Sequence, residues 1–123
     1  SIFGGEQWRP LLHVSDAARA FQIAMESPLE KINKQIFNTG LTNLQVKEIG
    51  NILKKNIPDA KIQVLNKFED QRSYNVSFEK IQKTLNFKAK NTIDMGIKEI
   101  VYALQKGIIK DPTDIKYYNN YSR

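Results

Sequence analysis

The chain has 123 residues, of which 41% are hydrophobic, and this is enough for the modest core of one domain. It contains no cysteine and a single histidine, which excludes disulfides, thiol catalysis and cysteine-ligated zinc and makes a metal site unexpected. Nineteen lysines and arginines against thirteen acidic residues leave a formal net charge of +6. The lysines are scattered along expected helix surfaces, which indicates a solvated surface and not a nucleic-acid site.

No apolar run approaches the roughly 20 residues that a membrane helix needs, and the first residues lack the charged-then-apolar layout of a signal peptide. We therefore expect a cytoplasmic protein that contacts no membrane. The chain starts at Ser1 and leads directly into a strand pattern with no preceding element. We therefore also expect it to be cut from a longer protein.

The first part of the sequence predicts short strands alternating with helices. Residues 11–14 are apolar apart from a histidine and indicate a short buried strand, and Ser15 followed by Asp16 indicates a helix that ends before Pro28. The run "QIFNTG", residues 35–40, has the β-branched and aromatic residues of a strand that is closed by a tight turn.

A second helix and another strand are expected next. Thr42 or Asn43 is expected to cap the helix, whose apolar residues recur at helical spacing until it ends near Pro58. Residues 60–66 alternate between apolar and polar with a period of two, which indicates a strand.

The last part of the chain predicts two further helices after a polar stretch at residues 67–76. Ser77 is expected to cap a short helix, and Thr92 is expected to start the longest one, whose apolar residues continue to Ile108. The tail, residues 111–123, is polar and aromatic without a period. The sequence therefore predicts a small mixed α/β lobe with short strands and about four helices.

Catalytic motifs are weak in this sequence. Its glycines lack the spacing of a dinucleotide or phosphate-binding turn, and the lone His13 is interpreted as a hydrogen-bonded core histidine. Tyr102 and Lys106 have the Y-x-x-x-K spacing of short-chain dehydrogenases, but they fall off the centre of the buried helix face and are interpreted as a partly exposed pair. Two Asn-x-Ser matches, at Asn75 and Asn120, are interpreted as coincidences. We therefore expect no catalytic residue in this chain.

Two arginines stand in polar segments that local structure does not explain. Arg9 lies in "GGEQWRP" and Arg72 in "EDQRSYNVS". The guanidinium group is always charged and binds phosphate oxygens through two parallel hydrogen bonds, so two such groups in one cleft would hold a diphosphate. The alternative is that both are ordinary surface ion pairs. Arg19, on the first predicted helix, is interpreted as an ordinary surface residue.

Four motifs in order connect these segments to a known family. They are "G-x-Q-x-R-P-x-x-H-V-x-D-x-A-R-A", "I-F-N-T-G", "R-S-Y-x-V-S-x-x-K-I-x-x-x-L-x-F" and "G-I-x-E-I". From about Gly4 through Ile108 the chain resembles the C-terminal part of the NAD-dependent epimerase/dehydratase family, the extended short-chain dehydrogenases that act on nucleotide sugars. The resemblance implies that residues 1–123 are the substrate-binding region of a Rossmann-type two-domain enzyme, with a core lobe at 1–110 and a tail at 111–123.

The resemblance also implies roles for individual residues. Arg9 and Arg72 match the family arginines that contact the substrate diphosphate. Asn43 matches a position that helps in some members, and Gln7 is a weaker candidate for substrate binding. Asp16 is expected to be structural and to assist the helix N-terminus. Many members have an "R-P-G-D/H" segment where this chain has "F-E-D-Q-R", so the nucleotide base is not inferred.

The complete enzyme implied by the resemblance would use NAD or NADP to oxidise a sugar carbon and later return the hydride, as an epimerase or a dehydratase. Its partners would be the nucleotide sugar, its own N-terminal Rossmann domain and, for the full enzyme, a second copy of itself. Because the Rossmann domain with its cofactor-binding and catalytic residues is absent from this sequence, we expect the isolated chain to be inactive. The alternative is a non-catalytic binding module, either a small basic nucleic-acid-binding domain or a partner-docking domain.

Overall fold

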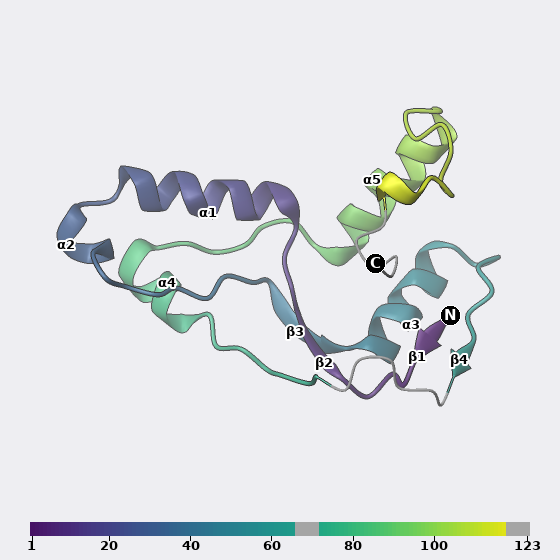
Figure 1. The fold of residues 1–123 in the computed structure, drawn as a ribbon, viewed down its shortest axis with the longest axis horizontal. Coiled ribbons are helices and arrows are strands. Elements are labelled where there is room, and N and C mark those ends of the chain that lie inside the picture. The colour runs from purple at the N-terminus through teal and green to yellow at the C-terminus, as the bar shows by residue number, and fades with distance from the viewer. Residues whose placement is uncertain (66–71, 118–123) are drawn as a thin grey trace.

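The computed structural model describes residues 1–65 and 72–117, and Figure 1 shows its ribbon. The elements within these ranges are β1 (Ile2–Phe3), β2 (Trp8–Leu11), α1 (Val14–Glu26), α2 (Leu29–Ile32), β3 (Thr42–Gln45), α3 (Val46–Asn56), β4 (Val64–Leu65), α4 (Glu79–Leu85), α5 (Ile93–Gln105) and a 3₁₀ turn at Ile115–Tyr117. The predicted mixed α/β class with short strands is confirmed. The helix that the prediction lacks is the four-residue α2.

The strands form two separate pairs that organise an elongated molecule. β1 pairs with β4 in parallel, and β2 pairs with β3 antiparallel, with Trp8 opposite Gln45 and Leu11 opposite Thr42. In Figure 1, β2 and β3 run through the middle of the molecule. The helices α1, α2 and α4 lie at one end, and α3 lies with β1 and β4 at the other end. The β2–β3 pair therefore connects two groups of elements.

The buried core is small and lies between α1 and α4. Among the described residues, four apolar side chains are buried: Ala20 on α1, Ile81 and Leu85 on α4, and Phe87 just after it. Phe37 packs at the edge of this cluster. At the other end of the molecule α3 packs against α5 and β1. The chain therefore has one small core and a second layer of helices that is only partly covered.

The boundary between β2 and α1 differs from the prediction. The strand ends at Leu11, and α1 already begins at Val14, whose side chain is exposed. The helix starts early because His13 is its N-cap residue: its backbone is extended, and its Nδ1 accepts a hydrogen bond of 3.2 Å from the N–H of Ser15. The prediction of a buried strand through residue 14 was wrong, since an imidazole nitrogen replaces the expected serine cap.

The second strand and the second helix also begin elsewhere than predicted. Residues 35–40 form no strand, and Thr42 and Asn43 lie in β3, where they pair with β2. Gln45 caps α3 instead, in a capping box in which Gln45 and Glu48 each accept a hydrogen bond from the other's backbone N–H. The signal of this box in the sequence is Gln followed three residues later by Glu, and it was not among the predicted helix caps.

The remaining predicted elements are found with shifted ends. Within the described part of the strand expected over residues 60–66, Val64–Leu65 are a strand, paired with β1. Helix α4 begins after Phe78, one residue later than the predicted cap at Ser77 implies. Thr92 caps α5 as predicted, accepting a hydrogen bond of 3.2 Å from the N–H of Met95. Residues 66–71, which include the first half of the polar stretch at residues 67–76, lie outside the described residues, and so does the Asn-x-Ser match at Asn120.

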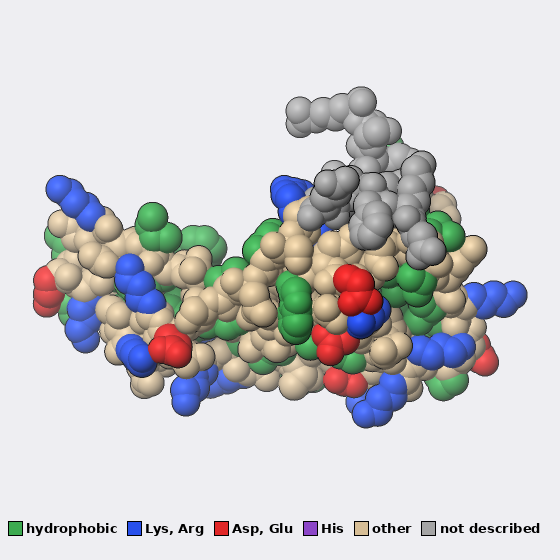
Figure 2. All heavy atoms as spheres, turned by 90° about the horizontal axis from the view of Figure 1, so that it is seen from below, with side chains coloured by type: hydrophobic (Ala, Val, Ile, Leu, Met, Phe, Trp, Pro, Cys, Tyr) green, Lys and Arg blue, Asp and Glu red, His purple; other side chains and the backbone are tan. Residues whose placement is uncertain are grey.

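Large apolar side chains are exposed on several elements. Those more than two-thirds exposed are Val14, Phe21, Met25, Leu29 and Ile36. Figure 2 shows hydrophobic side chains reaching the surface between the charged groups on the face that it presents. None of the helices in the described ranges is long and apolar enough to cross a bilayer.

Candidate functional site

A chain segment that carries Arg72 runs beside β2, and we call residues 72–78 the arginine segment. The N–H of Tyr74 donates to the carbonyl of Trp8 at 3.4 Å, and the N–H of Trp8 donates to the Ser73 hydroxyl at 3.1 Å. The segment therefore lies along the edge of β2. Residues far apart in the sequence meet at this edge.

Arg9 lies at the junction of β2 and the arginine segment. Its Nη1 donates to the carbonyl of Trp8 at 2.9 Å and to the carbonyl of Arg72. Its guanidinium also lies over the Tyr74 ring, 5.9 Å from the ring centroid, which is within the range of a cation–π interaction. The structure thus brings the two sequence-predicted arginines into neighbouring segments, with one guanidinium group bound to the backbone of the other residue.

Asn43 holds the other end of the arginine segment. Its Nδ2 donates to the carbonyl of Val76 at 3.0 Å, and its Oδ1 accepts from the N–H of Val76 at 2.9 Å. The side-chain amide therefore pairs with one backbone residue through both of its polar atoms. β3 positions this amide, because Asn43 stands opposite Pro10 in the β2–β3 register.

Gln7 is almost fully buried, with 6% of its surface exposed. Its Oε1 accepts from the N–H of Gly5 at 2.9 Å. Gly5 has a φ of +100°, a conformation that residues with a Cβ rarely adopt, so this bond fixes a turn that only glycine forms readily. In this structure Gln7 therefore holds the connection between β1 and β2.

Asp16 and Arg19 form a buried ion pair that the sequence analysis missed. Asp16 is completely inaccessible to solvent, and Arg19 Nη2 donates to its Oδ1 at 2.7 Å. The other carboxylate oxygen accepts from the N–H groups of Lys90 and Asn91 at 2.9 and 2.8 Å. Burial raises the pKa of Asp16, but the hydrogen bonds from Arg19 and these two amides outweigh it and lower the pKa to about 2.

The interpretation of Arg19 as an ordinary surface residue was therefore wrong. Besides its pair with Asp16, its guanidinium donates to the carbonyl of Lys88 and lies over the Phe87 ring at 4.8 Å. Asp16 lies in the first turn of α1, as expected for a residue that assists a helix start, but its carboxylate binds the segment before α5. The sequence signal was an acidic and a basic residue three positions apart on one helix.

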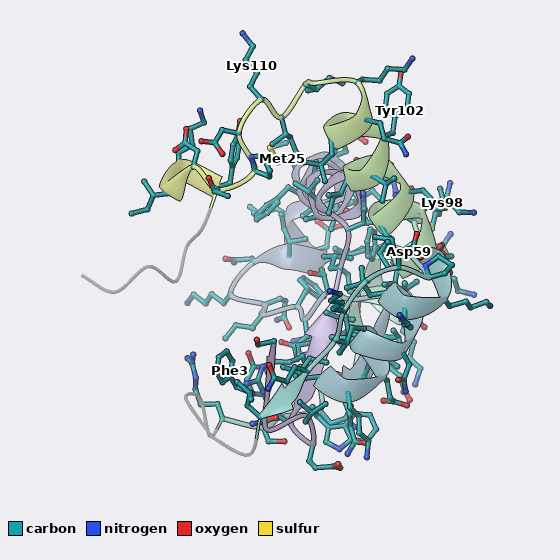
Figure 3. The ribbon with its side chains drawn as sticks, turned by 90° about the vertical axis from the view of Figure 1, so that its right-hand side faces the viewer. Phe3, Met25, Asp59, Lys98, Tyr102 and Lys110 are labelled. Atoms are coloured by element: carbon teal, nitrogen blue, oxygen red, sulfur yellow. The ribbon has the colours of Figure 1, made fainter. Side chains whose placement is uncertain are left out.

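The residues considered as catalytic candidates, His13, Tyr102 and Lys106, lie outside β2 and the arginine segment. His13 is largely buried and hydrogen-bonded, with Nε2 at 3.0 Å from Glu99 Oε2, but it caps a helix instead of standing in a strand. Tyr102 is 57% exposed on α5 with Lys106 Nζ at 5.9 Å from its ring, and Figure 3 shows it on the outer side of that helix. Within the described ranges no group of three or more His, Asp or Glu residues could hold a metal ion.

The glycine pair does not fit a dinucleotide. Gly4 and Gly5 both have positive φ, but the turn that they form leads into strand β2 and not into a helix N-terminus. A pyrophosphate-binding turn needs free amides at the start of a helix. Here the N–H of Gly5 is bound to Gln7. The Gly4–Gly5 turn therefore lacks the geometry of a pyrophosphate-binding turn, while guanidinium groups such as those of the two arginines can bind phosphate oxygens.

The fold and the sequence are similar to those of NAD-dependent enzymes. Residues 1–40 match the sequence model of the NAD dependent epimerase/dehydratase family. No curated protein sequence matches the chain. Three solved structures illustrate the resemblance, and each establishes a shared fold.

A UDP-glucose 4-epimerase from Thermotoga maritima, solved with UDP-glucose, has a TM-score of 0.71 and 23% identity over 88% of this chain. An L-threonine dehydrogenase from Clostridium difficile has a TM-score of 0.72 and 23% identity over 88% of this chain. MoeE5, solved with UDP-glucuronic acid and NAD, has a TM-score of 0.68 and 20% identity over 86% of this chain. The chain spans 36% of the length of each of these three proteins.

Proposed function

We propose that this chain is the C-terminal substrate-binding region of a cytoplasmic NAD(P)-dependent epimerase or dehydratase that acts on a nucleotide sugar. In this proposal Arg9 and Arg72 neutralise the substrate diphosphate. The cofactor and the catalytic residues belong to an N-terminal Rossmann domain, so the isolated chain is inactive. The binding energy from the diphosphate positions the sugar for reaction elsewhere in the enzyme.

One observation carries the proposal: the guanidinium of Arg9 is bound to the carbonyl of Arg72 across 63 residues of sequence. The contact brings the backbone of Arg72 to the guanidinium of Arg9, and a guanidinium binds an anion with several oxygens through two parallel hydrogen bonds. The half-exposed Tyr74 ring beside Arg9 adds an aromatic surface at the same place. A site with this chemistry suits a substrate that has a diphosphate.

The exposed apolar surface supports a large partner domain. Phe21, Met25 and Ile36 are among the large apolar side chains that are more than two-thirds exposed. Residues 36–40 also make no backbone hydrogen bond to other described residues, although buried strands normally do. Both features fit a lobe that completes its packing against a Rossmann domain.

A dehydrogenase acting on a small amino acid is the competing reading, because L-threonine dehydrogenases have similar folds. The paired arginines favour the nucleotide sugar, since the single carboxylate of an amino acid needs one guanidinium. The proposal therefore predicts binding of a diphosphate-containing ligand and no oxidation of L-threonine.

The test is ligand binding by the full-length protein. Calorimetry with a panel of UDP, GDP and dTDP sugars is expected to detect at least one ligand, and assays with NAD+ or NADP+ and L-threonine are expected to show no turnover. Arg9→Ala and Arg72→Ala should each weaken binding of that ligand by about 1.5 to 3 kcal/mol, the range for a charge-assisted hydrogen bond. Arg→Lys at either position should recover only part of this loss, because an ammonium lacks the planar fork.

The control removes one positive charge elsewhere. Lys110→Ala is suitable because Lys110 is exposed beyond α5 and points away from the rest of the molecule in Figure 3. Arg19→Ala is not suitable, since it would break the pair with Asp16. Unchanged affinity in both arginine variants, or an equal loss in Lys110→Ala, would show that the two arginines do not bind the ligand.

A further inference from the structure

We infer that Asn43 is a positioning residue of the arginine site, which holds the arginine segment in place and thereby keeps Arg72 beside Arg9. This inference rests on the proposed function for its ligand. It also replaces the expectation that Asn43 contacts the substrate itself. The role follows from how the arginine segment is attached to the rest of the molecule.

The segment is attached to β2 by two hydrogen bonds with Trp8, one from the Tyr74 N–H and one to the Ser73 hydroxyl. In the described residues, the one backbone hydrogen bond between the segment and β2 is Tyr74 N–H to Trp8 carbonyl, and at 3.4 Å it is long. Pro10, two residues further along β2, has no N–H to donate. The two bonds between the Asn43 side chain and the backbone of Val76 are shorter, at 2.9 and 3.0 Å. Asn43 therefore forms the shorter hydrogen bonds to the segment, at the position where backbone pairing with β2 has ended.

A second fixed point lies two residues beyond Val76. The ring of Phe78 lies so close to Gly40 that a Cβ at position 40 would overlap three of the ring atoms. The segment is thus held at Val76 by Asn43 and at Phe78 by Gly40, in addition to the contacts of Ser73 and Tyr74 with Trp8. If the Asn43 contact is lost, the segment that carries Arg72 is held less tightly beside β2, and the contact of Arg9 with the Arg72 carbonyl is weakened.

A positioning residue binds other parts of the protein, whereas a residue in direct contact with the ligand binds the ligand itself. Both polar atoms of its amide are already bound to Val76, which is what a positioning role requires. Asn43→Ala removes both bonds and adds no charge beside the two arginines. Two measurements on the full-length protein then separate the two roles.

The first measurement is amide hydrogen exchange without ligand. Asn43→Ala should speed exchange at Val76 by roughly tenfold, because the hydrogen bond from its N–H is lost, while exchange in α1 stays unchanged. Asn56→Ala is the matched control: Asn56 also donates two part-buried hydrogen bonds, to the carbonyl of Ile52 at 2.9 Å and to Asp94 at 2.8 Å, but between α3 and α5. It should leave exchange at Val76 unchanged.

The second measurement is a double-mutant cycle with UDP-glucose as the probe. Asn43→Ala should weaken binding by roughly tenfold in the wild-type background and by about twofold or less in the Arg72→Ala background, because its effect passes through Arg72. Asn56→Ala should leave the affinity unchanged in both backgrounds. General destabilisation would lower affinity equally in both backgrounds.

The inference is overturned if exchange at Val76 does not change in Asn43→Ala, or if the losses from Asn43→Ala and Arg72→Ala simply add, as for a direct ligand contact. If the wild-type protein binds no UDP-glucose or any other sugar nucleotide of the panel, the proposed function fails. The exchange measurement still decides in that case whether Asn43 holds the segment.

Discussion

The buried carboxylate of Asp16 shows how one residue joins two parts of the fold. It receives hydrogen bonds from Arg19 on its own helix and from two backbone amides in the segment before α5. A buried carboxylate is costly unless it is paired and hydrogen-bonded, and here three donors satisfy it. Asp16 therefore fixes the position of α1 against a segment more than 70 residues away in the sequence.

This carboxylate should make stability depend on pH in acid. Its pKa is lowered from 3.8 to about 2 in the folded state, so its ionised form stabilises the fold above pH 4 by about 2 kcal/mol. That contribution is lost as the pH falls from about 4 to 2. Denaturant unfolding as a function of pH should therefore show a falling free energy of unfolding over this window.

Asp16→Asn should be less stable at neutral pH, and its free energy of unfolding should depend less on pH between 4 and 2. The exposed Asp59, labelled in Figure 3, offers a control, because Asp59→Asn should keep the wild-type pH dependence. A wild-type stability that is flat between pH 4 and 2 would contradict the assignment of Asp16 as a buried, ionised carboxylate.

At the scale of elements, the strands are too short to be stable alone. β1 and β4 have two residues each, and β2 and β3 have four. An isolated two-stranded pair is marginal in water at best. Contacts with side chains of neighbouring segments therefore contribute much of the stability of this part of the fold. The contact of Phe78 with Gly40 is one of them.

Two buried glycines allow a matched test of this contact. Gly40→Ala should destabilise the protein by roughly 1 to 3 kcal/mol, because the added methyl group would collide with the rigid Phe78 ring. Gly50→Ala should change stability by less than about 1 kcal/mol, since its methyl would meet the mobile end of Ile2, at 2.5 Å, and alanine favours helix α3. Denaturant unfolding of both variants measures the difference.

A second substitution shows whether the ring is responsible. Phe78→Leu in the Gly40→Ala background should restore part of the lost stability, because the smaller side chain leaves room for the methyl group. Equal stabilities for Gly40→Ala and Gly50→Ala would mean that the Phe78 ring does not constrain position 40.

For the molecule as a whole, the main feature is that many large apolar side chains are exposed. Phe21 and Met25 project from α1, and Ile36 projects from the extended residues 35–40. Exposed apolar side chains beside backbone groups that form no strand pair favour association. The chain should therefore associate when no partner covers this surface.

We predict that the isolated 123-residue chain forms dimers or larger species. Light scattering over a concentration series should show a mass that rises with concentration, and an apolar-patch dye should bind. Replacing Ile36 and Met25, both exposed, with serine should reduce both signals with little loss of stability, because neither side chain is buried. A strict monomer at high concentration that binds no dye would contradict this prediction.

The sequence by itself determined the features that depend on neighbours along the chain. Helical spacing of apolar residues predicted α1, α3 and α5. Pro28 and Pro58 marked the ends of α1 and α3. Thr92 was correctly predicted as the cap of α5 because capping is a local hydrogen bond. The two arginines could be singled out because local structure gave no reason for them.

The tertiary structure decided the features that depend on contacts between distant segments. Residues 42–45 became a strand because β2 pairs with them, whereas the more strand-like residues 35–40 found no partner in the described chain. The spacing of Asp16 and Arg19 signals a pair on one helix, but only folding brings the Lys88 carbonyl and the Phe87 ring to Arg19. Asn43 likewise shows its two bonds to Val76 only when β3 and the arginine segment meet. Sequence patterns report local periodicity, while strand pairing and buried polar contacts depend on which distant groups fill the same space.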